Sequence, residues 1–265
     1  MQWWCSAGSA PWTWAWQAYP GVWLLVGLLA FAYHRASRHP DTPRQERRLG
    51  WIGVLTVWLA LDYPMGPLAA GYLATAHALQ FLMIAFIAAP LLLLGARTGL
   101  AARLPTAGPR AQALSVILHP LLAAAVFNIV TITTHVPQVN DGLMVSQLGA
   151  FTIDIAWLLG ALWFWWPLTV AVPSRPLFAV PLRMLYLFLG TVVHTGIAIV
   201  MLIRDYPMYS IYELAPRATA MDAMTDLKVA GGVMELLGIG IIFGILTAMF
   251  FRWTGGVGAE RPDSV

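Results

Sequence analysis

Imidazole, carboxylate and thioether side chains stand inside long apolar stretches of this chain, where such groups are costly to bury. The set that could hold a metal ion comprises His77, His135, Asp154, His194 and Met234. Polar residues within membrane-spanning helices usually face protein or a wet cavity, so these five are expected to point inward. Imidazole and thioether groups are copper ligands, and Cu(I) favours soft donors. The predicted chemistry is copper binding, and the alternative is a protein that binds no metal.

Helical spacing supports a shared centre for these groups. His77 and Gln80 are three residues apart, and Gln147 and Asp154 are seven apart. Residues at such intervals lie on one face of a helix. One polar stripe per helix is typical of a bundle with a hydrated or liganded centre.

The composition is that of a membrane protein. Of the 265 residues, 59% are hydrophobic and only 10% are charged, and the mean hydropathy is +0.71. Soluble domains carry about 25% charged residues. The net charge of +3 does not indicate a nucleic-acid partner, because the basic residues flank the apolar stretches. The single cysteine, Cys5, excludes an internal disulfide framework and a cysteine-based zinc site.

Seven apolar stretches are candidates to cross a bilayer as helices. They are expected at about 16–33, 49–61, 72–95, 113–134, 143–170, 182–203 and 227–253. The predicted fold is therefore an all-α, polytopic membrane helix bundle, with residues 1–265 in one domain. No basic residue precedes the first stretch and no small-residue cleavage site stands out, so a cleaved signal peptide is not expected.

The basic residues predict the orientation of the bundle. Almost all of them follow the odd-numbered stretches, and only Arg204, Arg217 and Lys228 fall on the other side. The positive-inside rule then places the N-terminus outside and the C-terminus inside. In that orientation the five candidate ligands lie in the outer half of the membrane.

Several motifs, read in order, resemble a known family. They are ALDYPMGPLA, TAHALQFLMIAFIAAPLLLLGA, THVPQVND, LWFWWPL, RDYPMYSIYE and DLKVAGGVM. From about Arg47 to Trp253 the chain resembles the multi-spanning cytochrome c oxidase assembly factor CtaG family, which is distinct from the single-span copper chaperone that shares its name. The resemblance implies a non-enzymatic role in maturing a haem–copper respiratory oxidase by bringing copper to it. The implied partners are oxidase subunits and the lipid of a bacterial inner (plasma) membrane.

Three departures from the family pattern favour a second reading. The family usually has another His four residues after the one that matches His77, and this chain has Phe81 there. A further family His has Asp154 as its nearest counterpart, and the segment Asp226–Lys228 replaces an Asp-Gln-Gln. The alternative function is a metal-free accessory or structural subunit of a membrane oxidase or of a related copper enzyme complex.

Other function classes have less support. Asp154 and Glu235 could serve a small transporter or a quinone-binding protein, because carboxylates within the membrane are expensive. His77, His135 or His194 could ligate a haem, for which axial His is common. The sequence has no nucleotide-binding glycine motif and no Ser/His/Asp arrangement, so an enzyme is not predicted.

Overall fold

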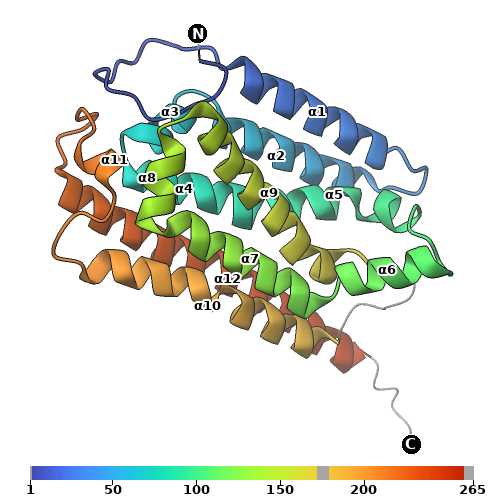
Figure 1. Ribbon diagram of the computed structural model, residues 1–265. Coiled ribbons are helices and arrows are strands. Elements are labelled where there is room, and N and C mark those ends of the chain that lie inside the picture. The colour runs from blue at the N-terminus through green and yellow to red at the C-terminus, as the bar shows by residue number, and fades with distance from the viewer. Residues whose placement is uncertain (1, 172–178, 260–265) are drawn as a thin grey trace, which may run out of the picture.

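The computed structural model describes residues 2–171 and 179–259, and within them every regular element is a helix (Figure 1). The elements in chain order are α1 (Pro20–Ala36), α2 (Arg44–Leu61), α3 (Met65–Gly71), α4 (Ala74–Leu82), the π-helical η1 (Met83–Ala88), α5 (Ala89–Ala101), α6 (Pro109–Ile117), α7 (Pro120–His135), α8 (Pro137–Met144), α9 (Gln147–Thr169), α10 (Val180–Ile203), α11 (Ser210–Glu213) and α12 (Ala223–Ala259). The all-α class predicted from the sequence is confirmed for these residues.

Among the residues that the structure describes, four helices are long and apolar enough to cross a membrane. They span Ala74–Ala101, Gln147–Thr169, Val180–Ile203 and Ala223–Gly255. Two bent pairs raise the number to six if each is one span: α2 with α3, bent by 49°, and α6 with α7, bent by 46°. The first predicted stretch, 16–33, falls on α1, which has only 17 residues. The described residues thus contain four to six candidate spans by length and composition, and the seven predicted from the sequence stay a prediction.

Proline explains where several predicted boundaries were wrong. The first helix begins at Pro20 rather than near residue 16, because proline favours the first helical turn and holds the preceding Tyr19 outside the helix. Pro120 likewise restarts the helix within the predicted stretch 113–134. The widened turn η1 comes just before Pro90, whose ring and missing N–H do not fit a regular helical turn.

The predicted stretch 143–170 also contains a break. Helix α8 ends at Met144 and α9 begins at Gln147. Between them Ser146 caps α9, because its hydroxyl accepts a hydrogen bond of 3.0 Å from the Gly149 N–H. The start of this stretch therefore belongs to α8, a separate short helix.

The long helices run side by side, with α10 packed on α12 and α2 packed on α5 (Figure 1). The second pair is in backbone contact: a Cβ on Gly95 would come 2.4 Å from the Cα of Gly50. Tyr33 of α1 closes over the same place, and its hydroxyl donates to the Arg47 carbonyl at 2.8 Å. Glycine therefore fixes the spacing of α1, α2 and α5.

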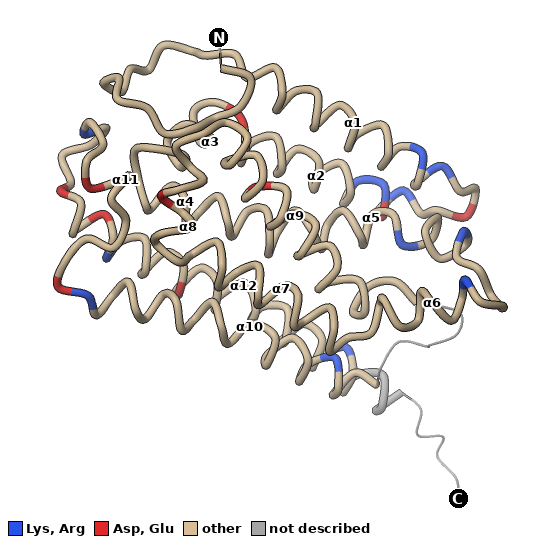
Figure 2. The backbone as a smooth tube through the Cα atoms, in the orientation of Figure 1, with Lys and Arg blue, Asp and Glu red and all other residues tan. Residues whose placement is uncertain are grey.

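Charge divides the bundle into two ends (Figure 2). The basic end contains the α1–α2 connection and the C-terminal part of α12, where Lys and Arg gather. In the chain, Arg35 and Arg44 flank this connection and Arg252 lies in the C-terminal part of α12. The acidic end lies opposite, around α3 and α11, where Asp and Glu gather. Asp62 directly follows α2, and Glu213 is the last residue of α11. Large apolar side chains on α1, α10 and α12 are exposed between these ends, as lipid-facing helices require.

Candidate functional site

His77 and His135 meet inside the bundle, toward the acidic end. His77 belongs to α4 and His135 is the last residue of α7, and each is only 2% exposed. Their ring centroids are 5.9 Å apart. Trp157 of α9 lies against both rings, with centroid distances of 4.9 Å to His77 and 5.9 Å to His135. Together with Phe81, these residues form what we call the histidine cluster.

A backbone carbonyl fixes the protonation of His135. Its Nδ1 lies 2.8 Å from the Thr131 carbonyl oxygen, which can only accept a hydrogen bond, so the proton is on Nδ1. The lone pair is therefore on Nε2, which is buried and has no hydrogen-bond partner among the described residues. Tyr209 holds the end of this helix by donating to the His135 carbonyl at 3.0 Å.

His77 is held by a buried amide. Its Nε2 lies 3.0 Å from the Asn140 side-chain nitrogen, and Asn140 comes from the short helix α8. Nδ1 of His77 is buried, and the described residues offer it no hydrogen-bond partner. Asn140 was not a candidate from the sequence, because α8 itself was not predicted. Its signal is the run PQVND, which begins two residues after His135.

His194 repeats the arrangement of His135 on α10. Its Nδ1 donates to the Thr191 carbonyl at 2.5 Å, and its buried Nε2 lacks a partner in the described part of the chain. The ring faces α12, where a Cβ on Gly238 would come 2.4 Å from Nε2. Met234 stands one helical turn before Gly238 and is fully buried. His194 is thus nearer to α12 than to the other two imidazoles.

Two phenylalanine rings connect His194 to the histidine cluster. The ring centroid of Phe81 lies 5.1 Å from that of His135, and the ring centroid of Phe86 lies 5.2 Å from that of His194. The centroids of the two phenylalanine rings are 5.8 Å apart. His77 and His135 therefore form a pair, and aromatic rings occupy the space toward the third imidazole.

Asp154 is turned toward the N-terminal segment. Its Oδ2 accepts a hydrogen bond of 2.8 Å from the Trp4 indole N–H, and Trp4 is fully buried. The adjacent Cys5 is buried as well, and its thiol donates to the Leu61 carbonyl at 3.4 Å. Burial raises the pKa of this thiol well above its ordinary value, so Cys5 remains uncharged. Asp154 thus anchors a segment that covers the acidic end.

The five predicted ligands consequently lie in three places. His77 and His135 are in the histidine cluster, His194 and Met234 lie where α10 faces α12, and Asp154 lies beside Trp4. Among the residues that the structure describes, no group of three or more His, Cys, Asp or Glu side chains could hold a metal ion. Within the predicted set, His77 and His135 lie together, with 5.9 Å between their ring centroids. A copper site built from all five residues remains a prediction.

Asp226, which the sequence analysis named only as part of a family motif, has a structural role in the site. It precedes the apolar part of α12 and is buried. Its carboxylate accepts from the N–H groups of Ala74 and Thr75 at 2.7 and 3.1 Å, and from the Thr75 hydroxyl at 2.6 Å. These are the free N–H groups at the start of α4, so Asp226 fixes the helix that carries His77.

The comparisons with known proteins decide the family. The family model described as cytochrome c oxidase caa3 assembly factor (Caa3_CtaG) matches residues 25–255. This chain belongs to the Caa3_CtaG family. The prediction from the sequence motifs is thereby confirmed, and the family is one of cytochrome c oxidase assembly factors. No curated protein and no solved structure matches the chain.

The structure of this Caa3_CtaG member shows where Phe81, one of the departures from the family pattern, lies. Phe81 packs edge-on against His135 and Trp157, with centroid distances of 5.1 and 5.3 Å. The position of Phe81, at which the family resemblance implies a second His, therefore faces the histidine cluster. An aromatic ring fills that place here.

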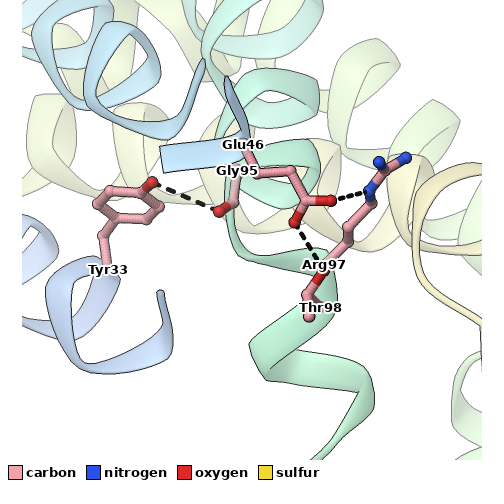
Figure 3. Close-up of polar contacts among 5 residues, drawn as sticks. All are labelled: Tyr33, Glu46, Gly95, Arg97 and Thr98. Atoms are coloured by element: carbon pink, nitrogen blue, oxygen red, sulfur yellow. Dashed lines mark hydrogen bonds and ion pairs between the residues drawn. The ribbon is translucent and has the colours of Figure 1, made fainter. Parts of the chain in front are cut away.

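A second buried polar network lies at the basic end of the Caa3_CtaG bundle (Figure 3). Glu46 of α2 accepts from the Arg97 Nε at 2.7 Å and from the Thr98 hydroxyl at 2.8 Å. The carboxylate is 6% exposed, whereas the Arg97 side chain is 51% exposed. Both carboxylate oxygens are paired. This network joins α2 to α5, and nothing in the sequence pattern distinguished Glu46 from a surface residue.

Proposed function

We propose that this cytochrome c oxidase assembly factor handles copper for a haem–copper oxidase, and that the histidine cluster is where copper binds. The observation that carries the proposal is His135, whose Nδ1–H is fixed on a carbonyl while its buried Nε2 has no partner in the described structure. His77 lies beside it, with 5.9 Å between ring centroids. Copper is the cargo in this proposal, rather than a permanent cofactor.

The donors present fit such a cargo. A metal-binding His commonly donates its second ring N–H to a backbone carbonyl or a carboxylate, and both His135 and His194 do so. Buried nitrogen atoms without hydrogen bonds are rare and call for an unseen water or ion. Nδ1 of His77 is a third such atom among the described residues. Met234 adds a thioether on the α12 side, which suits Cu(I).

We further propose that the chain crosses a bacterial inner membrane seven times, with the N-terminus outside and the C-terminus inside. The N-terminal segment lies at the acidic end and the C-terminal part of α12 at the basic end, so the number of crossings is odd (Figures 1 and 2). Counting α1 and each bent pair as one crossing makes seven. The positive-inside rule assigns the basic end to the cytoplasm. The histidine cluster then faces the side on which copper arrives from outside.

Copper loading tests this proposal. The full-length protein is purified anaerobically, incubated with Cu(I), desalted and assayed for bound metal. We expect about one copper per chain and a loss of most of it in the His77→Ala and His135→Ala variants, because each removes one donor. His39→Ala is the matched control, since His39 lies in the α1–α2 connection at the basic end. Equal copper in all four proteins contradicts the proposal.

The second candidate is a metal-free subunit that remains bound to a membrane oxidase. It is favoured by the packing of Phe81 and Trp157 around His135, which is that of an apolar core. Exposed apolar faces on α10 and α12 offer surfaces for another membrane protein. Co-purification in mild detergent separates the two functions. A fixed ratio to an oxidase with no bound copper supports the subunit, and copper on a protein that dissociates from the oxidase supports the copper carrier.

A further inference from the structure

A groove at the basic end combines apolar walls with three arginines. It has a volume of about 330 Å³ and lies between α5, α9, α10 and α12. Leu94, Trp165 and Met249 are among its apolar wall residues. Arg97, Arg183 and Arg252 line it as well, and we call it the arginine groove. These arginines come from three helices that are distant in the sequence.

The charges of the arginine groove are not balanced within it. None of the described residues that line it is acidic. Glu46 pairs with Arg97 through Nε, and the two terminal nitrogens of that guanidinium project away from the carboxylate (Figure 3). Nε of Arg183 is buried, and the described residues provide no acceptor for it. The groove therefore presents guanidinium N–H groups, the terminal ones of Arg97 and the Nε of Arg183, for which its described lining provides no acidic residue.

We propose that the arginine groove binds an anionic phospholipid, with the phosphate on the arginines and an acyl chain along the apolar wall. Arginine suits phosphate because its planar fork donates several parallel hydrogen bonds. Basic pockets between membrane helices on the cytoplasmic side are suited to anionic headgroups. The position at the basic end of a lipid-exposed bundle puts these donors at headgroup level. Soluble phosphate would use the arginines only, whereas a lipid also uses the apolar wall.

Lipid retention during native mass spectrometry tests this binding. The full chain in mild detergent is mixed with phosphatidylglycerol or with phosphatidylcholine of the same acyl chains. We expect the wild-type protein to retain phosphatidylglycerol preferentially, and the double variant Arg183→Gln/Arg252→Gln to bind it roughly tenfold more weakly. The matched control is Arg35→Gln/Arg110→Gln, which removes the same charge from the basic end outside the groove.

A second variant tests the wall and keeps all the charges. Ala248 lines the groove, so Ala248→Trp fills the acyl-chain path. We expect this variant to lose phosphatidylglycerol while its copper binding and its unfolding remain those of the wild type. Equal retention of the two lipids by the wild-type protein overturns the proposal. It is also overturned if the control loses as much lipid as the groove variant, or if the groove variant retains lipid fully. If Ala248→Trp retains phosphatidylglycerol as the wild type does, the lipid proposal is overturned, and an acidic segment of a partner protein becomes the better occupant of the groove.

Discussion

The Glu46 network at the basic end and the histidine cluster differ in how completely their buried polar atoms are hydrogen-bonded. At the basic end, each oxygen of Glu46 accepts one hydrogen bond, from Arg97 and from Thr98. In the histidine cluster, His77 and His135 each keep one buried nitrogen without a partner in the described structure. The basic end also brings backbones into direct contact at Gly50 and Gly95, whereas the cluster is surrounded by aromatic side chains.

Under the proposed function, this difference separates the structural role of the Glu46 network from the copper-binding role of the histidine cluster. A buried carboxylate that is fully paired contributes to holding α2 on α5, and little capacity is left for a ligand. A buried imidazole nitrogen without a hydrogen bond lowers the free energy of unfolding, and only a bound ligand can offset that cost. Polar burial alone is therefore a poor guide to function in a membrane bundle. The unfilled hydrogen-bonding capacity is the better guide.

The largest effect is expected where the two backbones touch. Gly95→Ala should cost about 3 kcal/mol, because its Cβ would come 2.4 Å from the Gly50 Cα and neither backbone can yield locally. SDS-induced unfolding measures this change. Gly240→Ala is the control, since nothing lies within 4 Å of a Cβ there. Equal stability of the two variants would show that α2 and α5 are not fixed by this contact.

Removing the carboxylate at the basic end should have the next largest effect. Glu46→Leu leaves Arg97 and Thr98 without their acceptor and should cost about 2 kcal/mol. The expected cost is below that of breaking a fully buried ion pair, because Arg97 is half exposed and water replaces part of the interaction. The same unfolding assay measures it, with Asp41→Leu in the exposed α1–α2 connection as the control. A variant as stable as the wild type would remove the structural role of this network.

A smaller effect is expected at the start of α4. Asp226→Ala removes the cap on the Ala74 and Thr75 N–H groups and should cost about 1 kcal/mol. Because α4 carries His77, the variant should also lower copper affinity without removing a donor. Copper titration and SDS unfolding on the same sample check both effects. Asp222→Ala is the matched control, since Asp222 is exposed and caps only its own helix through Thr225.

The sequence predicted the elements well where one apolar run forms one helix. The stretch expected at 182–203 is α10, Val180–Ile203, because no proline or polar break interrupts it after its first turn. Bends and short helices were missed, as at α8, because eight residues with mixed polarity carry little periodic signal. Boundaries near Pro20 and Pro120 shifted for the same local reason, since proline starts a helix more strictly than hydropathy does.

The candidate site was predictable in part. Topology alone placed His77 and His135 at similar depth on different helices, and they do pair. The partner of Asp154 was beyond sequence reasoning, because Trp4 reaches it through the path of an irregular N-terminal segment. The role of Asp226 could not be predicted either. Its carboxylate caps α4, which is distant in the sequence, and such a tertiary contact leaves no local pattern.

The smallest expected change in stability is the sharpest test of the comparison. His135→Phe should alter the free energy of unfolding by less than about 1 kcal/mol, because it removes one hydrogen bond together with a buried nitrogen that has none. The new ring can keep the stacking on Trp157, where the planes now lie 27° apart. Copper binding should nevertheless disappear. A loss of stability as large as that of Glu46→Leu, with copper binding unchanged, would make the two networks equivalent and remove the histidine cluster as the copper site.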